Sequence, residues 1–350
     1  MLVRAAQLSD LSALLALAVE AGSGMTSLPA NEEYLGRRLQ RSQASFAGQQ
    51  PMADADYLLV LEDEAGQVVG TSGMIAAAGL REPWYSYRVG LTVTASQALN
   101  VYRQQPTLFL TNDLTGATAL CSLYLQMPHR HSLNGRLLSK ARFIHMAEFS
   151  DDFAPKVIAE IRGVSDRQGR SPFWDSLGQH FFRMDFARAD YLTGAGSKAF
   201  IAEMMPKLPL YTCFLSDEAQ QAIGQVHPDS EPALTMLNEE GMDYQGYIDI
   251  FDGGATLEAR SEQIRSISES HLAALAIGSP GQEAQIYLIH NRERADCRIT
   301  AAPGRLEGQR LIVDADTAAL LQLQPAAVVR AVPLVGGPGV AADPYARMLT

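Results

Sequence analysis

Residues 120–142, LCSLYLQMPHRHSLNGRLLSKAR, decide the fold of this 350-residue chain. The leucine and tyrosine residues between positions 120 and 125 predict a β-strand, which Pro128 ends. The polar run 130–135 must then turn, because the apolar residues from position 137 onward follow helical spacing. The segment therefore predicts a strand, a polar loop that contains glycine, and the first turns of a helix.

This order of elements is suited to binding a phosphate group. The N-terminus of a helix presents unpaired backbone N–H groups to anions. Arg130, Arg136, Lys140 and Arg142 add cationic side chains around the turn, so backbone and charge could hold a diphosphate together. The segment predicts cofactor binding through a pyrophosphate, and an ordinary strand-to-helix connection is the alternative.

The loop resembles the Arg/Gln-x-x-Gly-x-Gly/Ala element with which the GNAT acyltransferase superfamily binds coenzyme A. Arg130 and Gly135 occupy the outer positions of that element. Leu133 stands where the first glycine is usual, so one backbone approach to the pyrophosphate would be either looser or made through Ser132. The cofactor-binding residues predicted in this loop are Arg130, Asn134, Gly135 and Arg136.

Long stretches elsewhere in the chain are similar to the arginine N-succinyltransferase family, and they run nearly from end to end. The resemblance looks closest to the single-subunit enzyme and to the beta subunit of the two-subunit form, which some bacteria use for ornithine as well as arginine. The stretches are TSLPANEEYL, REPWYSYRVGLTV, TNDLTG, NGRLLSKARF, SPFWDSLGQHFF, ADYLTGAGSKAFIAEMMPK, PLYTCFL, GQVHPDSEPAL, GYIDIFDGG and LIHNRERADCRITAAP.

The resemblance implies transfer of succinyl from succinyl-CoA, as cosubstrate, to the α-amine of L-arginine. The amine would attack directly in a ternary complex, without a metal. Leu125 matches the position at which the family contacts succinyl-CoA, and a backbone contact suits the end of a strand better than a side-chain contact. The alternatives are a related N-acyltransferase that uses ornithine or another acyl-CoA, and a non-catalytic partner subunit of a heteromeric enzyme.

His227 is the predicted catalytic residue, because it matches the histidine that the family uses as proton donor. A histidine can give a proton to the departing thiolate and recover it at little cost, since its unperturbed pKa lies near neutrality. His129 and His131 flank the phosphate loop and are interpreted as partners of coenzyme A or as exposed loop residues. The general base is not identifiable from the sequence.

Four charged residues at strand ends are candidate contacts for the guanidinium and carboxylate groups of the substrates. Charged residues at strand ends are commonplace, so structural pairing is the preferred interpretation and none is assigned to the site. They are Arg88, Asp113, Asp249 and Asp252.

Composition limits the possible functions. A net charge of −11 and a pI near 5.1 argue against nucleic-acid binding, which needs an excess of Lys and Arg on a surface. Cys121, Cys213 and Cys297 are isolated, with no disulfide framework or zinc spacing, and are expected to be buried hydrophobes. No signal-peptide pattern and no apolar run of about 20 residues is found. A cytoplasmic protein is expected, as a homodimer or as a heteromer with a related subunit.

The predicted fold class is α+β, with a mixed, mostly antiparallel sheet of GNAT-like type, a second smaller half and a C-terminal β-rich module. The expected divisions are a GNAT-like CoA-binding domain over 1–185, a second GNAT-like half over 186–260, the β-rich module over 261–335 and a flexible tail over 336–350. Helices are expected at 32–46, 134–149, 232–240 and through the aromatic residues 173–181. The strands expected are 57–61, 68–75, 85–94, 107–112, 157–162, 247–251, 273–277, 286–290, 297–300, 308–313 and 327–334, with strands or a helix-strand unit at 199–204 and 211–214.

Overall fold

The computed structural model describes residues 1–22, 24–166, 168–194 and 204–336. Within these residues the strands are β1 (Leu2–Ala5), β2 (Asp56–Glu62), β3 (Val68–Ile75), β4 (Ser86–Ser96), β5 (Val101–Thr111), β6 (Thr118–Leu125), β7 (Lys156–Glu160), β8 (Leu210–Tyr211), β9 (Asp243–Ile248), β10 (Ala255–Arg260), β11 (His271–Ile277), β12 (Gln285–His290), β13 (Arg298–Glu307), β14 (Arg310–Val313) and β15 (Val328–Pro333).

The α-helices in the same residues are α1 (Leu11–Ala21), α2 (Glu32–Phe46), α3 (Asn134–Glu148), α4 (Gln179–Phe182), α5 (Phe186–Gly194), α7 (Asp217–Ala222), α8 (Glu231–Asn238), α9 (Arg265–Ser268) and α10 (Ala315–Leu320). A π-helical turn, Trp174–Gly178, leads into α4. None of the described helices combines the length and the apolar character needed to cross a membrane.

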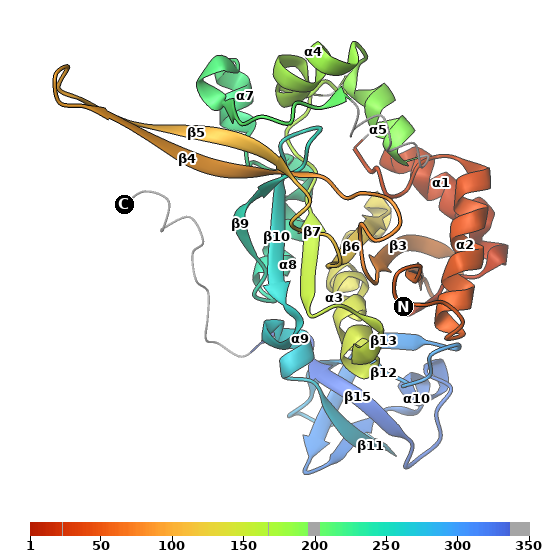
Figure 1. Cartoon of the computed structure of the whole chain (residues 1–350). Coiled ribbons are helices and arrows are strands. Elements are labelled where there is room, and N and C mark those ends of the chain that lie inside the picture. Colours follow the sequence, from red (N-terminus) through yellow and green to blue (C-terminus); the bar gives the residue numbers. More distant parts are fainter. Residues whose placement is uncertain (23, 167, 195–203, 337–350) are drawn as a thin grey trace.

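The strands form one continuous hydrogen-bonded sheet whose main part has the order β1-β2-β3-β6-β7-β10-β9-β4-β5-β8. All of these pairs are antiparallel except β6 and β7, which are parallel. The polypeptide crosses from β6 to β7 through α3, which packs against β3 and β6 (Figure 1). Helices α1 and α2 pack together beside β2 and β3. The strand, loop and helix that the segment 120–142 predicts are therefore found, and the next strand lies parallel to the first.

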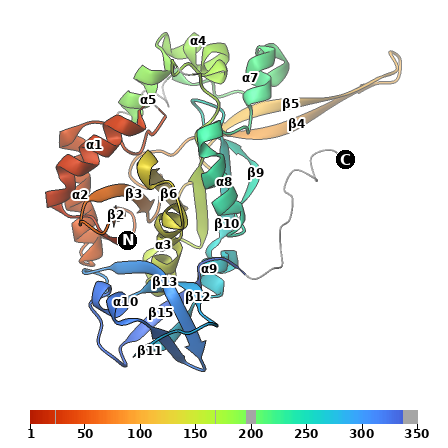
Figure 2. The same cartoon turned by 180° about the vertical axis from the view of Figure 1, so that it is seen from behind.

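The C-terminal strands close into a barrel. Strands β12, β15, β11, β14 and β13 follow one another, and β12 also pairs with β13, which completes the ring. Strand β13 begins by pairing with β1 and ends by pairing with β14, so it joins the barrel to the main sheet (Figure 2). The expected β-rich C-terminal part is therefore confirmed, and its strands form a closed ring.

Strands β4 and β5 form a long hairpin that projects away from the body of the molecule (Figure 1). Its outer half exposes apolar side chains, and Leu91, Leu99 and Tyr102 are 60%, 75% and 65% exposed. A free two-stranded hairpin is only marginally stable in water. The sequence predicted strands at 85–94 and 107–112 but not a hairpin of this length.

Several element predictions are wrong in detail. Residues 212–214 form a 3-10 helix after the short strand β8 instead of continuing a strand. The strand expected at 247–251 ends at Ile248, and β10 was not predicted. The aromatic residues Phe173 and Trp174 are buried in a second core cluster, as expected. The segment 199–203 and the tail after residue 336 lie outside the described residues.

Candidate active site

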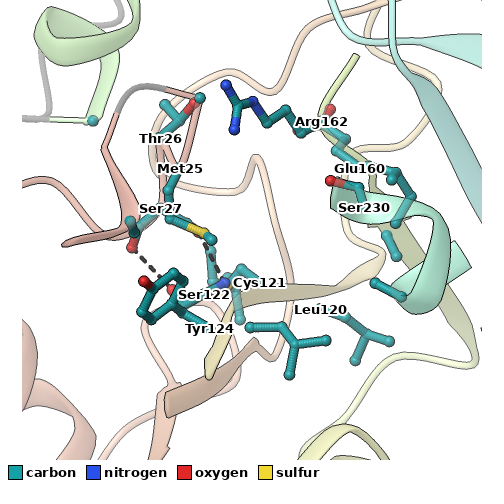
Figure 3. Close-up of a pocket in the computed structure, with 18 of the residues that line it drawn as sticks. Met25, Thr26, Ser27, Leu120, Cys121, Ser122, Tyr124, Glu160, Arg162 and Ser230 are labelled. Atoms are coloured by element: carbon teal, nitrogen blue, oxygen red, sulfur yellow. Dashed lines mark hydrogen bonds between the residues drawn. The ribbon is translucent and has the colours of Figure 1, made fainter. Parts of the chain in front are cut away.

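A cavity of about 1150 Å³ opens where β6 and β7 separate (Figure 3). Met25, Thr26 and Ser27, in the loop between α1 and α2, form one wall. The opposite wall comes from the end of β7 and the start of α8, and residues of β6 run along the floor. Segments distant in sequence thus meet around one space, which is the usual arrangement of a substrate site.

The separation of the two strands has a local cause in β6. The parallel pairing of β6 with β7 runs from Thr118 to Leu120 and goes no further. Ser122 has a φ of 53°, and the register between β3 and β6 shifts at this point, so Ser122 forms a bulge. A bulge bends its strand and ends regular pairing. The bulge therefore opens a gap beside β6 in which backbone polar groups can face a ligand.

The bulge is held by the loop between α1 and α2. The backbone N–H of Ser122 donates to Ser27 Oγ at 2.9 Å, and Ser122 Oγ donates to Ser27 O at 2.9 Å (Figure 3). Arg38, from α2, donates to Ser122 Oγ at 2.7 Å and forms a buried ion pair with Asp56 at 2.9 Å. These contacts fix the floor of the cavity against the wall that faces it.

The start of α3 contributes residues to the cavity lining. The first backbone hydrogen bond of the helical ladder runs from Leu137 N to Leu133 O, so the amides of Gly135 and Arg136 precede that ladder. Both residues line the cavity. Ser132, which stands beside the substituted glycine position, has a φ of 55° and also lines the cavity.

The other predicted cofactor residues hold this loop together. Arg130 Nε donates to Leu125 O at 2.7 Å, and the guanidinium lies over the Tyr124 ring. The Leu125 side chain is buried in the main core, which leaves its backbone for any ligand contact. The Asn134 side chain is buried and donates to His129 O, and Asn134 does not line the cavity. Arg136 forms an ion pair with Glu239.

Two of the basic residues near the loop do not surround the turn, so that part of the prediction is wrong. Lys140 is 1% exposed and forms an ion pair with the buried Glu240 at 2.9 Å. Arg142 is 2% exposed and bonds only within its own helix, to Ser139, among the described residues. Both lie one to two helical turns past the loop, where α3 is covered by the sheet and by α9.

Gly135 provides a test of the pyrophosphate assignment. A Cβ on Gly135 would meet no atom of the protein within 4 Å. The change Gly135→Ala should therefore leave the melting temperature equal or slightly higher, because alanine restricts the unfolded chain. If the diphosphate approaches this backbone, the same change should raise KM for the CoA substrate about 10-fold. Steady-state kinetics beside a thermal melt would separate the two effects, and an unchanged KM would contradict the assignment.

His227 lies next to the cavity instead of on its wall, where Asp229 and Ser230 are found. Its backbone N–H donates to Arg162 O at 2.8 Å, and its Nδ1 accepts from the Asp229 N–H at 3.1 Å. Burial and the nearby Arg162 guanidinium lower the pKa of His227, while Asp229 acts to raise it. The other ring nitrogen, Nε2, makes no hydrogen bond to the described residues.

The end of β7 supplies two charged residues that the sequence analysis missed. Glu160 and Arg162, two residues apart, both line the cavity, and Arg162 extends its guanidinium across it toward Thr26 (Figure 3). Arg162 donates from Nη2 to Ser165 Oγ at 3.1 Å, and its Nε has no hydrogen-bond partner in the described part of the chain. The signal available in the sequence was a pair of charged residues at alternate positions, one at the end of a strand and one just past it.

The four charged strand-end residues that were set aside all have structural contacts. Arg88 donates to Gln245 O and lies over the Tyr247 ring, and Asp113 accepts from Tyr247 Oη. Asp249 and Asp252 accept from backbone N–H groups of the turn that follows β9.

A cluster of His145, His290 and Cys297 lies buried between α3 and the barrel. His145 Nδ1 and His290 Nε2 are 3.1 Å apart, and Cys297 Sγ is 3.6 and 3.5 Å from them. A metal-bound histidine donates its other N–H to an acceptor, whereas His290 Nδ1 accepts from the Arg292 N–H. Burial lowers the pKa of His145 to about 3. The contacts fit a chain of neutral hydrogen-bonded groups better than a metal centre.

The cysteines follow the expectation only in part. Cys297 is buried, Cys121 is half-buried in the cavity wall, and Cys213 is exposed. Cys213 lies in the 3-10 helix that replaces the expected strand, which removes the sheet that would have covered it.

Comparisons with known proteins cover most of the chain. Residues 1–266 match the family described as arginine N-succinyltransferase beta subunit, and residues 271–333 match the C-terminal domain of that subunit. The arginine N-succinyltransferase subunit beta of Pseudomonas aeruginosa is 60% identical over 334 residues, which are 95% of this chain and 98% of the relative. An arginine N-succinyltransferase of Escherichia coli is 50% identical over 90% of this chain and 92% of the relative.

A solved structure has the same fold over its full length. The arginine/ornithine succinyltransferase subunit AI of Pseudomonas aeruginosa superposes with a TM-score of 0.88 at 36% identity, covering 96% of this chain and 99% of that chain.

Proposed function

The chain belongs to the arginine N-succinyltransferase family, and we propose that it transfers the succinyl group of succinyl-CoA to the α-amine of L-arginine. The observation that carries this proposal is the family match over almost the entire chain. The cavity at the separation of β6 and β7 supports it, because that gap gives an acyl-CoA access to strand backbone and to the start of a helix.

We propose that the fold is GNAT-like and that succinyl-CoA lies along β6. Its pyrophosphate would meet the amides of Gly135 and Arg136, and the side chain of Arg130 would stand beside it. Leu125 would contribute backbone contacts, and Asn134 would support the loop from inside. The pantetheine arm would then run back along β6 and bring the thioester to the bulge at Ser122.

We propose that L-arginine binds against the wall formed by the end of β7 and the start of α8. Its α-carboxylate needs a cation, and the guanidinium of Arg162 extends into the cavity where that group would arrive. Glu160, on the same wall, supplies negative charge for the ammonium or guanidinium group of the substrate. The amine would attack the thioester carbonyl directly, in a ternary complex.

In this reaction His227 would carry the proton that the amine loses and the leaving thiolate gains. Bond formation between the α-nitrogen and the acyl carbon breaks the carbon–sulfur bond, so the products are an amide and free coenzyme A. His227 ends the reaction in the protonation state in which it began. The position of His227 beside Arg162 supports this role, since it places the ring next to the proposed carboxylate anchor.

Free thiol release is the direct test. Purified protein should release thiol from succinyl-CoA only when L-arginine is present, and mass spectrometry should find N-succinylarginine. Ornithine and acetyl-CoA, tested as replacements, would show whether the related activities hold instead. If no pairing releases thiol, the stand-alone activity is wrong, and the non-catalytic partner-subunit alternative takes its place.

We further propose that the chain works as a homodimer or as a heteromer with a related subunit. The projecting β4–β5 hairpin, with its exposed apolar residues, is the surface we expect a second chain to cover. Light scattering of the purified chain would contradict a homodimer if it gave the monomer mass.

The division of the chain into parts at residues 185, 260 and 335 stays a prediction, and so does a cytoplasmic location.

A further inference from the structure

Arg142 is a buried cation with no carboxylate partner in the described residues. It lies in α3, is 2% exposed, and lines the cavity. Its Nε donates to Ser139 O and its Nη2 to Ser139 Oγ, both at 2.9 Å and both within the same helix. Five N–H groups belong to a guanidinium, so hydrogen-bonding capacity remains on the side of the cavity.

The other buried cations around α3 are neutralised, which makes Arg142 distinctive. Arg38 forms an ion pair with Asp56 at 2.9 Å, and Lys140 forms one with Glu240 at 2.9 Å. The titratable neighbour that acts on Arg142 is Cys121, and no carboxylate among the described residues does so. Burial without an anion lowers the pKa of Arg142 to about 10. An unpaired buried charge destabilises the folded state, so its presence in a cavity wall points to a ligand.

Arg142 also lies at the part of the cavity that the acyl group of a bound acyl-CoA would reach. Leu138 packs where Gly70 pairs with Leu125, because a Cβ on Gly70 would lie 2.9 Å from Leu138 Cδ2. Arg142 lies one helical turn further on the same face, and it is near enough to Cys121, which pairs with Gly73 beside the bulge, for the two side chains to interact. Arg142 also follows Gly135 by seven residues, or about 10 Å of helix. An acyl-CoA that starts at Gly135 and follows β6 to the bulge therefore brings its acyl group to Arg142.

We propose that Arg142 binds the distal carboxylate of the succinyl group and thereby selects a dicarboxylic acyl-CoA over acyl-CoAs with an uncharged acyl chain. This inference rests on the proposed function. The succinyl carboxylate would supply the anion that the folded chain itself does not, and a planar guanidinium can bind it through two parallel hydrogen bonds. An acyl group without that carboxylate would leave Arg142 unpaired in the closed site.

The variant Arg142→Met tests this selectivity, with butyryl-CoA as the probe of similar length and no carboxylate. We expect kcat/KM for succinyl-CoA to fall about 100-fold, because the carboxylate would be buried without its partner. The value for butyryl-CoA should stay equal or rise. The melting temperature should not fall, since methionine replaces an unpaired buried charge with an apolar side chain of similar length.

Arg38→Met is the matched control, because Arg38 lines the same cavity but already pairs with Asp56. It should lower the melting temperature and affect both acyl-CoAs alike. Arg142→Lys should recover part of the preference for succinyl-CoA. Equal losses with succinyl-CoA and butyryl-CoA in Arg142→Met, or a lowered melting temperature, would overturn the inference in favour of a structural role.

Binding separates this inference from the proposed function. Succinyl-CoA should raise the melting temperature of the wild-type chain more than butyryl-CoA does, and Arg142→Met should abolish that difference. This readout does not require turnover or arginine. A wild-type chain that binds succinyl-CoA selectively but transfers nothing would contradict the proposed reaction and keep the role of Arg142, whereas equal shifts by both ligands would overturn that role.

Discussion

Replacing His227 with alanine should lower kcat for succinyl transfer by about 10²–10⁴-fold, the range typical for loss of a group that transfers a proton in the transition state. The fold should survive, because the side chain makes one hydrogen bond, from the Asp229 N–H, at the start of a short 3-10 turn. KM for succinyl-CoA should change little, since His227 is not part of the loop that precedes α3. Thiol release under saturating substrates measures the effect directly.

The pH dependence gives a second readout for the same residue. The pKa of His227 lies below its usual 6.5, first because of burial and then because of Arg162. The ring is therefore mainly neutral at pH 7 and must gain the proton of the amine before it passes that proton to the thiolate. We expect kcat/KM of the wild type to rise with pH through a pKa below 6.5, and this limb should be absent in His227→Ala.

His180 is the control histidine, because it is exposed and does not line the cavity. His180→Ala should retain the wild-type kcat and pH profile. Full activity of His227→Ala would remove His227 from the mechanism while leaving the proposed reaction intact. Loss of the melting transition in that variant would mean that the residue is structural.

Local sequence predicted the central junction well. The leucines of β6, the proline after it and the apolar spacing of α3 each depend on short-range preferences, and all are found in the structure. A C-terminal β-rich module was expected from its short strand-like runs, but its closure into a barrel depends on β12 pairing with β13 as well as β15. No pattern within one strand encodes such a long-range pairing.

The polar residues were harder to predict, because their roles depend on what covers them. Arg136, Lys140 and Arg142 are close in sequence, yet they meet a surface carboxylate, a buried carboxylate and the cavity. Helical geometry makes the three side chains point in different directions from α3, and only tertiary packing decides which of them is buried. The same argument holds for His145 and His290, which are 145 positions apart and in contact.

Removing the buried carboxylate of Glu240 should have the largest effect on stability. Its side chain is 0% exposed, and it forms ion pairs with Lys140 and Arg265, both at 2.9 Å, and accepts from the Ser266 N–H at 2.7 Å. Lys140 also donates to Leu334 O, so the network joins α3, α9 and the segment after β15. Glu240→Leu should lower the free energy of unfolding by about 3–5 kcal/mol, because Lys140 would stay buried with only the more distant, partly exposed carboxylate of Glu239, at 3.6 Å, as its anion. Denaturant titration measures this loss.

Acid should weaken the same network. Burial alone would raise the pKa of Glu240, but Lys140 and Arg265 outweigh it and hold that pKa below its usual range. A carboxyl whose folded pKa is depressed stabilises the fold above its unfolded pKa, and that contribution is lost as the pH falls through the folded value. The wild type should therefore lose stability toward acid more steeply than Glu240→Leu does.

The neighbouring Glu239 is the control, because it carries the same charge as Glu240 but is exposed. Its side chain is 36% exposed and pairs with Arg136 and, at the longer distance of 3.6 Å, with Lys140. Glu239→Gln should therefore change the free energy of unfolding by less than about 1 kcal/mol, because Lys140 keeps Glu240 at 2.9 Å. The double variant Lys140→Met, Glu240→Leu should be markedly more stable than Glu240→Leu alone, because it removes the stranded cation together with its partner. Lys140→Met alone completes the comparison. If the stability losses of Lys140→Met and Glu240→Leu add up to the loss of the double variant, the ion pair with Lys140 is not what stabilises this junction, and the contacts of Glu240 with Arg265 and Ser266 carry the effect instead.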